Sequence, residues 1–134
     1  PRLYREAPVN AIWEGSGNVQ CLDMLRAMSR TPGSLEALFA EIDEARGLNK
    51  TFDGFVHATK QQFADLTDVE FRARALVEQL ALSLQASVLL RADNETVANG
   101  FCETRLQQGS HQMYGTIPRG VDCEAIIQRA KPQV

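Results

Sequence analysis

Six consecutive residues of this 134-residue chain combine the side chains best suited to chemistry: Trp13, Glu14, Gly15, Ser16, Gly17 and Asn18. They stand where a helix is predicted to begin. Glycine lets the backbone approach a ligand closely, and the unsatisfied N–H groups of a first helical turn favour negative partners such as phosphate. A carboxylate at such a point could accept a proton. The residue types alone favour an ordinary helix cap, with Glu14 as a solvated loop acid.

The wider sequence around these residues resembles the signature of the acyl-CoA dehydrogenase family. Residues 4–8 read Tyr-Arg-Glu-Ala-Pro, and residues 12–20 read Ile-Trp-Glu-Gly-Ser-Gly-Asn-Val-Gln. The family usually has a run of tyrosine, glutamate, glycine, threonine and serine here. The sequence here is more similar to the AidB-like, adaptive-response branch, which has tryptophan for tyrosine and Ser-Gly-Asn for the threonine-serine run. Residues 86–91, 101–105 and 114–120 are similar to that branch as well, so the resemblance covers nearly the whole chain.

The resemblance implies an FAD-dependent oxidoreductase that acts on an acyl-CoA thioester. Glu14 would be the catalytic base, which removes a proton from the α-carbon while a hydride leaves the β-carbon for the flavin. Ser16, Gly17 and Asn18 fall at positions that bind the FAD cofactor. Trp13 and Gly15 fall beside the flavin and the acyl chain, where they would bind substrate. The resemblance also implies a homo-oligomer, since members of the family are tetramers.

Two other functions remain open at this stage. The AidB-like branch is associated with DNA binding and protection, for which the candidate residues are Arg72, Arg74, Arg91, Arg105, Arg119, Arg129 and Lys131. Residues 68–134 hold seven Lys/Arg against eight Asp/Glu, a net charge of −1, and this balance disfavours a nucleic-acid surface. The second alternative is a helical oligomerisation domain, because residues 75–90 are apolar on more than one face.

Apolar residues recur at helical spacing along most of the chain. This periodicity predicts an all-α bundle of five or six helices, which would position these residues. The expected helices cover residues 18–30, 35–46, 51–66, 67–92, 93–106 and 122–130. Thr31-Pro32 and Thr51 are expected to begin the second and third helices. Thr67 and Glu70 are expected to form a capping box, Asp93 or Asn94 to cap the next helix, and Asp122 the last one.

Composition predicts one soluble domain over residues 1–134, with a net charge of −3 and 44% hydrophobic residues. Cys21, Cys102 and Cys123 are expected to be free thiols and mostly buried. His57 and His111 have no ligand-type neighbours, so no metal site is expected. The apolar segment 75–90 is interrupted by polar residues, so no membrane span is expected, and the location is predicted to be cytoplasmic.

The chain begins at Pro1 without an initiating methionine, and we expect it to be the C-terminal fragment of a longer flavoprotein. Residues 1–30 would supply the flavin-site loop and the helix after it, and residues 31–134 the remaining helices. The fragment alone is expected to be inactive, because the family's β-domain and earlier helices supply most contacts to flavin and CoA.

Overall fold

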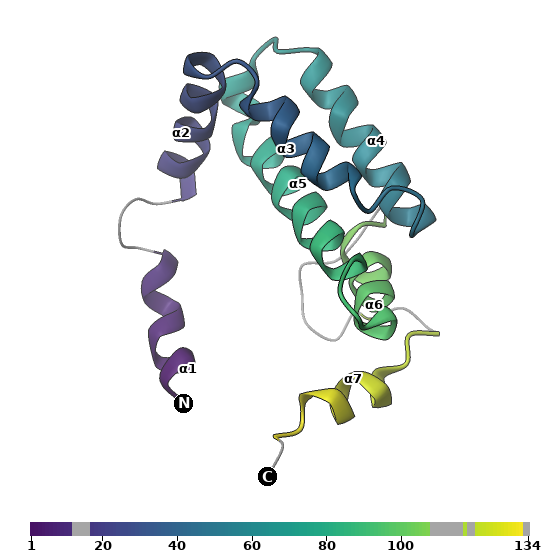
Figure 1. The fold of residues 1–134 in the computed structure, drawn as a ribbon. Coiled ribbons are helices and arrows are strands. Elements are labelled where there is room, and N and C mark those ends of the chain that lie inside the picture. The colour runs from purple at the N-terminus through teal and green to yellow at the C-terminus, as the bar shows by residue number, and fades with distance from the viewer. Residues whose placement is uncertain (12–16, 108–116, 118–119, 133–134) are drawn as a thin grey trace.

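The structure is a computed structural model, which describes residues 1–11, 17–107, 117 and 120–132. Its elements are α1 (Arg2–Glu6), the 3-10 helix η1 (Ala7–Ala11), α2 (Gly17–Arg30), α3 (Ser34–Asp43), α4 (Lys50–Ala64), α5 (Val69–Leu90), α6 (Glu95–Arg105) and α7 (Cys123–Ala130) (Figure 1). The described part of the chain contains no strand, so the all-α class is confirmed. It holds one or two more helices than expected, because the short α1 lacks the apolar periodicity that signals a helix.

Helix α5 is the centre of the bundle, and α2, α3, α4 and α6 all pack against it (Figure 1). Its inner side buries Ala73, Leu76, Leu80, Ser83, Ala86 and Ser87. By length and composition alone α5 could cross a membrane, with a mean hydropathy of 1.2 over 18 residues. A core helix of a bundle meets the same criterion, and α5 packs against four neighbours, with 33% of that window buried.

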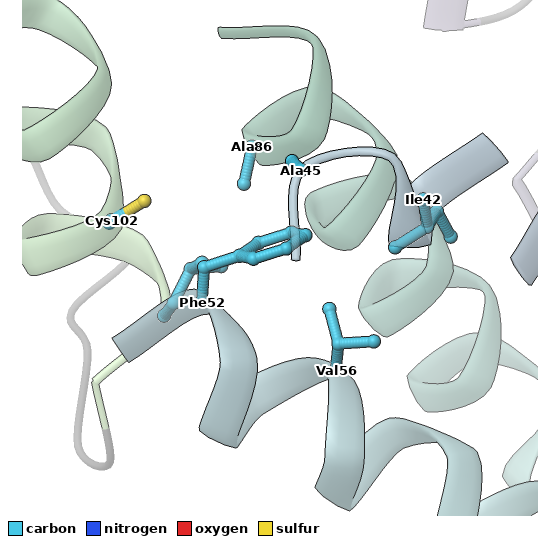
Figure 2. Close-up of a cluster of buried hydrophobic side chains, with 7 residues drawn as sticks. Ile42, Ala45, Phe52, Val56, Ala86 and Cys102 are labelled. Carbon is cyan, nitrogen blue, oxygen red and sulfur yellow. The ribbon is translucent and has the colours of Figure 1, made fainter. Parts of the chain in front are cut away.

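Two hydrophobic clusters hold these helices together. The cluster in Figure 2 joins α3, α4, α5 and α6 through Ile42, Ala45, Phe52, Val56, Ala86, Cys102 and Leu106. The second cluster joins α4 to the first half of α5 through Phe63, Leu76 and Leu80, and the partly buried Met24 and Met28 of α2 pack on it. Burying large apolar side chains of this kind stabilises a fold by about 1.5–3 kcal/mol each.

The ends of the helices confirm some predicted caps and correct others. The Asn94 side chain accepts from the Val97 N–H at 2.9 Å, and Asp122 accepts from the Ala125 N–H at 2.9 Å. The Thr51 cap is wrong, because the Asn49 side chain caps α4 by accepting from the Phe52 N–H at 3.0 Å. The Thr31-Pro32 start is also wrong. Helix α3 begins at Ser34 after Gly33, whose φ of 106° suits glycine.

The predicted capping box of Thr67 and Glu70 is wrong as well. Asp68 is the N-cap of α5, with φ 52° and no side-chain capping bond. Instead, Asp65 accepts from the Thr67 N–H at 2.8 Å, and the Arg72 guanidinium donates to the carbonyls of Gln62, Asp65 and Thr67. The Thr67 N–H and then its hydroxyl hold the pKa of the Asp65 carboxyl below its usual value. Arg72 therefore fixes the turn between α4 and α5 in place of a capping box.

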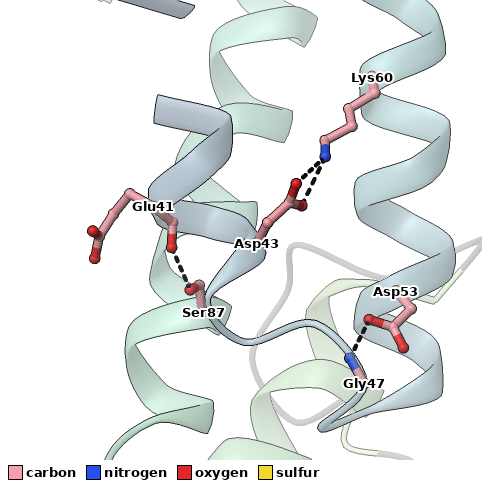
Figure 3. A network of polar contacts seen from close by, with 6 residues as sticks. All are labelled: Glu41, Asp43, Gly47, Asp53, Lys60 and Ser87. Atoms are coloured by element: carbon pink, nitrogen blue, oxygen red, sulfur yellow. Dashed lines mark hydrogen bonds and ion pairs between the residues drawn. The ribbon is translucent and has the colours of Figure 1, made fainter. Parts of the chain in front are cut away.

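Polar contacts connect α3 to α4 and to α5 (Figure 3). Lys60 of α4 donates to the Asp43 carboxylate at 2.7 Å and 2.5 Å, and the Ser87 hydroxyl of α5 donates to the Glu41 carbonyl at 3.3 Å. Helix α3 ends at Asp43 and not at Arg46 as expected, because the chain continues in single turns up to Gly47. Gly47 has φ 85° and donates its N–H to Asp53 at 3.0 Å.

Ser83 and Ser87 can be compared directly, since both are fully buried on α5. Ser87 donates to Glu41, whereas the Ser83 hydroxyl has no hydrogen-bond partner among the described residues. We expect Ser87→Ala to lower the free energy of unfolding by about 1 kcal/mol, and Ser83→Ala to leave it unchanged or raise it slightly. Urea denaturation of both variants measures the difference. An equal loss in the two variants would contradict the assigned hydrogen bond.

Candidate functional site

The predicted site divides into two parts in the structure. Trp13, Glu14, Gly15 and Ser16 lie outside the described residues, so the structure does not test their predicted roles. Gly17 and Asn18 are the first two residues of α2, and both are exposed. The predicted helix start is therefore confirmed to within one residue. The first turn of α2 contains no acidic residue.

Helix α2 is anchored to the core one turn beyond this start. Cys21 is only 6% exposed, and Met24 and Met28 pack against the second cluster. The helix packs against α5 and also touches α3 (Figure 1). The core of the bundle thus sets the position of Gly17 and Asn18, because these residues continue a helix whose buried side is fixed.

Arg74 of α5 lies beside the start of α2. Its guanidinium nitrogen Nη2 would be 3.8 Å from a Cβ added to Gly17, which is an ordinary van der Waals contact. From the sequence, Arg74 was expected only as a contact for DNA. No local pattern could have revealed its place next to Gly17, because that place depends on how α2 packs across α5. The exposed Arg74 brings a positive charge to the N-terminal end of α2, which is also the positive end of the helix dipole.

Hollows on the surface lie elsewhere in the bundle. An open hollow of about 500 Å³ lies between α2 and α5, lined by Leu22, Leu25, Arg26, Ser29, Val69 and Glu70. Another of about 430 Å³ lies between α6 and α7, and three acids line it, Glu95, Glu103 and Asp122. All three accept hydrogen bonds from other groups. No group of three metal-ligating side chains occurs in the described residues, and His111 lies outside them.

The arginines proposed for DNA binding are partly engaged within the fold. Arg72 binds the turn before α5, and Arg91 pairs with Glu41 of α3. Arg119 lies outside the described residues. Arginines held by carbonyls or carboxylates are less available to neutralise phosphates, so these contacts weaken the DNA hypothesis further.

The three cysteines are free thiols, as expected. Cys21 and Cys102 are buried, whereas Cys123 is exposed at the first position of α7. Burial, and then the charge of the neighbouring Glu103, raise the pKa of the Cys102 thiol to about 11. Cys102 therefore serves packing within the first cluster and is a poor nucleophile near neutral pH.

Comparison with known proteins identifies the class of protein. The chain is 37% identical over 106 residues to the putative acyl-CoA dehydrogenase AidB of Escherichia coli K12, and the aligned segment covers 79% of this chain and 19% of that protein. It is 29% identical over 130 residues to acyl-CoA dehydrogenase family member 11 of Caenorhabditis elegans, and that aligned segment covers 97% of this chain and 18% of that protein. No protein-family model and no solved structure matches the chain.

These similarities place the chain in the acyl-CoA dehydrogenase family. The chain spans less than a fifth of the length of each of the two curated relatives. Within the family, it is an AidB-like region. The resemblance noted in the sequence is therefore confirmed at the level of the family and the branch.

The burial of the cysteines predicts how the thiols react. At pH 8 we expect one thiol, Cys123, to react quickly with Ellman's reagent, and Cys21 and Cys102 to react only after unfolding. With a pKa of about 11, only roughly one thousandth of Cys102 is thiolate at that pH. Cys123→Ser should abolish the fast phase. A fast phase of two or three thiols in the folded chain would contradict the burial.

Proposed function

We propose that this chain is the C-terminal part of a longer, FAD-dependent acyl-CoA dehydrogenase-like oxidoreductase, with Glu14 as its catalytic base. The observation that carries the proposal is the similarity to the putative acyl-CoA dehydrogenase AidB. The sequence Trp-Glu-Gly-Ser-Gly-Asn at residues 13–18 adds to it, because it puts a carboxylate directly before the start of a helix.

The described end of this loop fits a cofactor that carries phosphates and hydrogen-bond acceptors. Gly17 and Asn18 are exposed, no acid stands in the first turn of α2, and Arg74 adds a positive charge beside Gly17. Among the described residues, a Cβ at residue 17 would meet Arg74 alone. In the proposal, Ser16, Gly17 and Asn18 hold the cofactor through the hydroxyl, the backbone and the amide side chain.

The proposed reaction is the α,β-dehydrogenation of an acyl-CoA thioester to an enoyl-CoA. When bound, FAD supplies the acceptor for the hydride that leaves the β-carbon. Glu14 takes the proton from the α-carbon onto a carboxylate oxygen, and the electron pair of the broken C–H bond becomes the new double bond. Trp13 and Gly15 flank the acyl chain and exclude water. An apolar neighbour such as Trp13 favours the neutral form of a carboxyl group and so suits a base that must accept a proton.

The proposal is tested by Glu14→Gln in the full-length flavoprotein. We expect the variant to keep its bound flavin but to lose anaerobic bleaching by an acyl-CoA, with a rate lower by about 100-fold to 10,000-fold, the usual contribution of a general base. Asp23→Asn is the matched control, since Asp23 is an exposed acid on α2 that pairs with Arg26. The control should bleach normally, and normal bleaching in Glu14→Gln would overturn the assignment.

A second prediction concerns the 134 residues by themselves. We expect the purified chain to be helical, colourless and without dehydrogenase activity, because it spans less than a fifth of either curated relative. Absorbance near 450 nm and far-UV circular dichroism measure both properties. A yellow chain with one flavin per molecule would show that these 134 residues bind flavin by themselves, and would contradict the prediction.

A further inference from the structure

Arg74 of α5 carries a guanidinium group that the described part of the fold does not use. The residue is exposed, and none of the described residues shares a hydrogen bond or an ion pair with it. Other arginines of the bundle are engaged: Arg72 donates to the carbonyl of Thr67, and Arg91 pairs with Glu41 of α3. Arg74 therefore remains available to a group from outside these helices.

The guanidinium of Arg74 reaches toward α2 and not along its own helix. Glu70 and Glu78 stand four residues before and after it, the spacing at which opposite charges pair on a helix. Arg74 pairs with neither, and its Nη2 lies 3.8 Å from the place that a Cβ would take on Gly17. The packing of α2 against α5 thus brings a positive group from one helix to the first residue of the other.

Gly17 contributes space beside this guanidinium. Among the described residues, a Cβ added to Gly17 would meet Arg74 alone, at an ordinary contact distance. Any longer side chain would therefore compete with a ligand for the space next to the guanidinium. Gly17 and the following Asn18 are both exposed, so the described residues leave this space open to solvent. Glycine is the residue that lets a bound group come close to the backbone here.

The charges around this space suit a phosphate group. A guanidinium is planar and can donate parallel hydrogen bonds to phosphate oxygens, which strengthens and orients the contact. The N-terminal end of α2 is the positive end of its helix dipole, and its first turn contains no acidic residue. A carboxylate would satisfy the same charges, but the proposed cofactor, FAD, offers phosphates, because it contains a pyrophosphate.

From these contacts we propose that Arg74 binds the pyrophosphate of FAD, in the space that Gly17 leaves beside it. The inference rests on the proposed function, in which Ser16, Gly17 and Asn18 hold this cofactor, and it assigns the binding of the cofactor's charge to a distant part of the chain. The pyrophosphate is the negatively charged part of oxidised FAD, whereas the oxidised flavin ring is neutral. Arg74 is thus a cofactor-binding residue and takes no part in the proton transfer assigned to Glu14.

Binding of FAD to the full-length apoprotein, followed by the quenching of flavin fluorescence, tests the role of Arg74. We expect Arg74→Gln to raise the Kd for FAD by about 10-fold to 100-fold, the usual contribution of a hydrogen bond to a charged group. Arg74→Lys should recover part of this loss because it keeps the charge, and the Kd of Arg74→Gln should depend less on salt than that of the wild type. Arg129→Gln is the matched control, since Arg129 is an exposed arginine on α7, and it should bind FAD as the wild type does.

Substitution of Gly17 tests the space beside the guanidinium. Gly17→Asp should weaken FAD binding about tenfold more than the isosteric Gly17→Asn, because a carboxylate would pair with Arg74 and repel the phosphates. An acid at the start of a helix stabilises the helix, and circular dichroism checks that all variants are folded. Unchanged FAD affinity in Arg74→Gln, or equal losses in the two Gly17 variants, would overturn this inference alone. A full-length wild type that binds no FAD would overturn the proposed function as well.

Discussion

The packing of four helices against one side of α5 is the constraint on which the rest of the structure depends. Leu76 and Leu80 bury the first half of that side against α4 and α2, and Ala86 buries the second half against α3 and α6. Small residues at positions 83, 86 and 87 let neighbours approach closely, and Ser87 adds a hydrogen bond to α3. Because α5 contributes to both clusters, a change in its inner side would affect every other helix of the core.

This arrangement positions the start of α2 through contacts within the bundle. Cys21 and the two methionines of α2 are held by the core, and Gly17 and Asn18 continue the same helix into solvent. Arg74 reaches the same place from α5. In the proposed flavin site, the bundle would contribute the first turn of α2, the Asn18 side chain and the positive charge of Arg74. Glu14, the proposed base, lies outside the described residues.

Much of the fold could be predicted from the sequence because apolar periodicity is strong in α2, α3, α4 and α6, and because α5 is a long, largely apolar segment. The cap Asp122, and a cap at Asp93 or Asn94, could be predicted because Asp and Asn are preferred directly before a helix. The structure selects Asn94 of the second pair. The expected capping box failed because Asp65 takes the Thr67 N–H, and Arg72 takes the carbonyls, through contacts that no short motif encodes.

The candidate site was predictable only through its resemblance to a family. The residue types at positions 13–18 alone favour a simple helix cap, and the proposal of a catalytic role for Glu14 rests on the similarity to AidB. Arg74 could not be foreseen, because its place beside Gly17 arises from packing between distant segments. The sequence shows that residues 75–90 are apolar on more than one face, but the 93% exposure of Phe71 emerged only from the fold.

The central claim is that packing on α5 holds α2, and with it the edge of the proposed site. Native-state hydrogen exchange of the 134-residue chain tests it most directly. The amides in the last three turns of α2 should exchange nearly as slowly as those of α5, and those of α1 and α7, which bury no side chain, much faster. Exchange in α2 as fast as in α1 would show that α2 is not anchored, and would contradict the account.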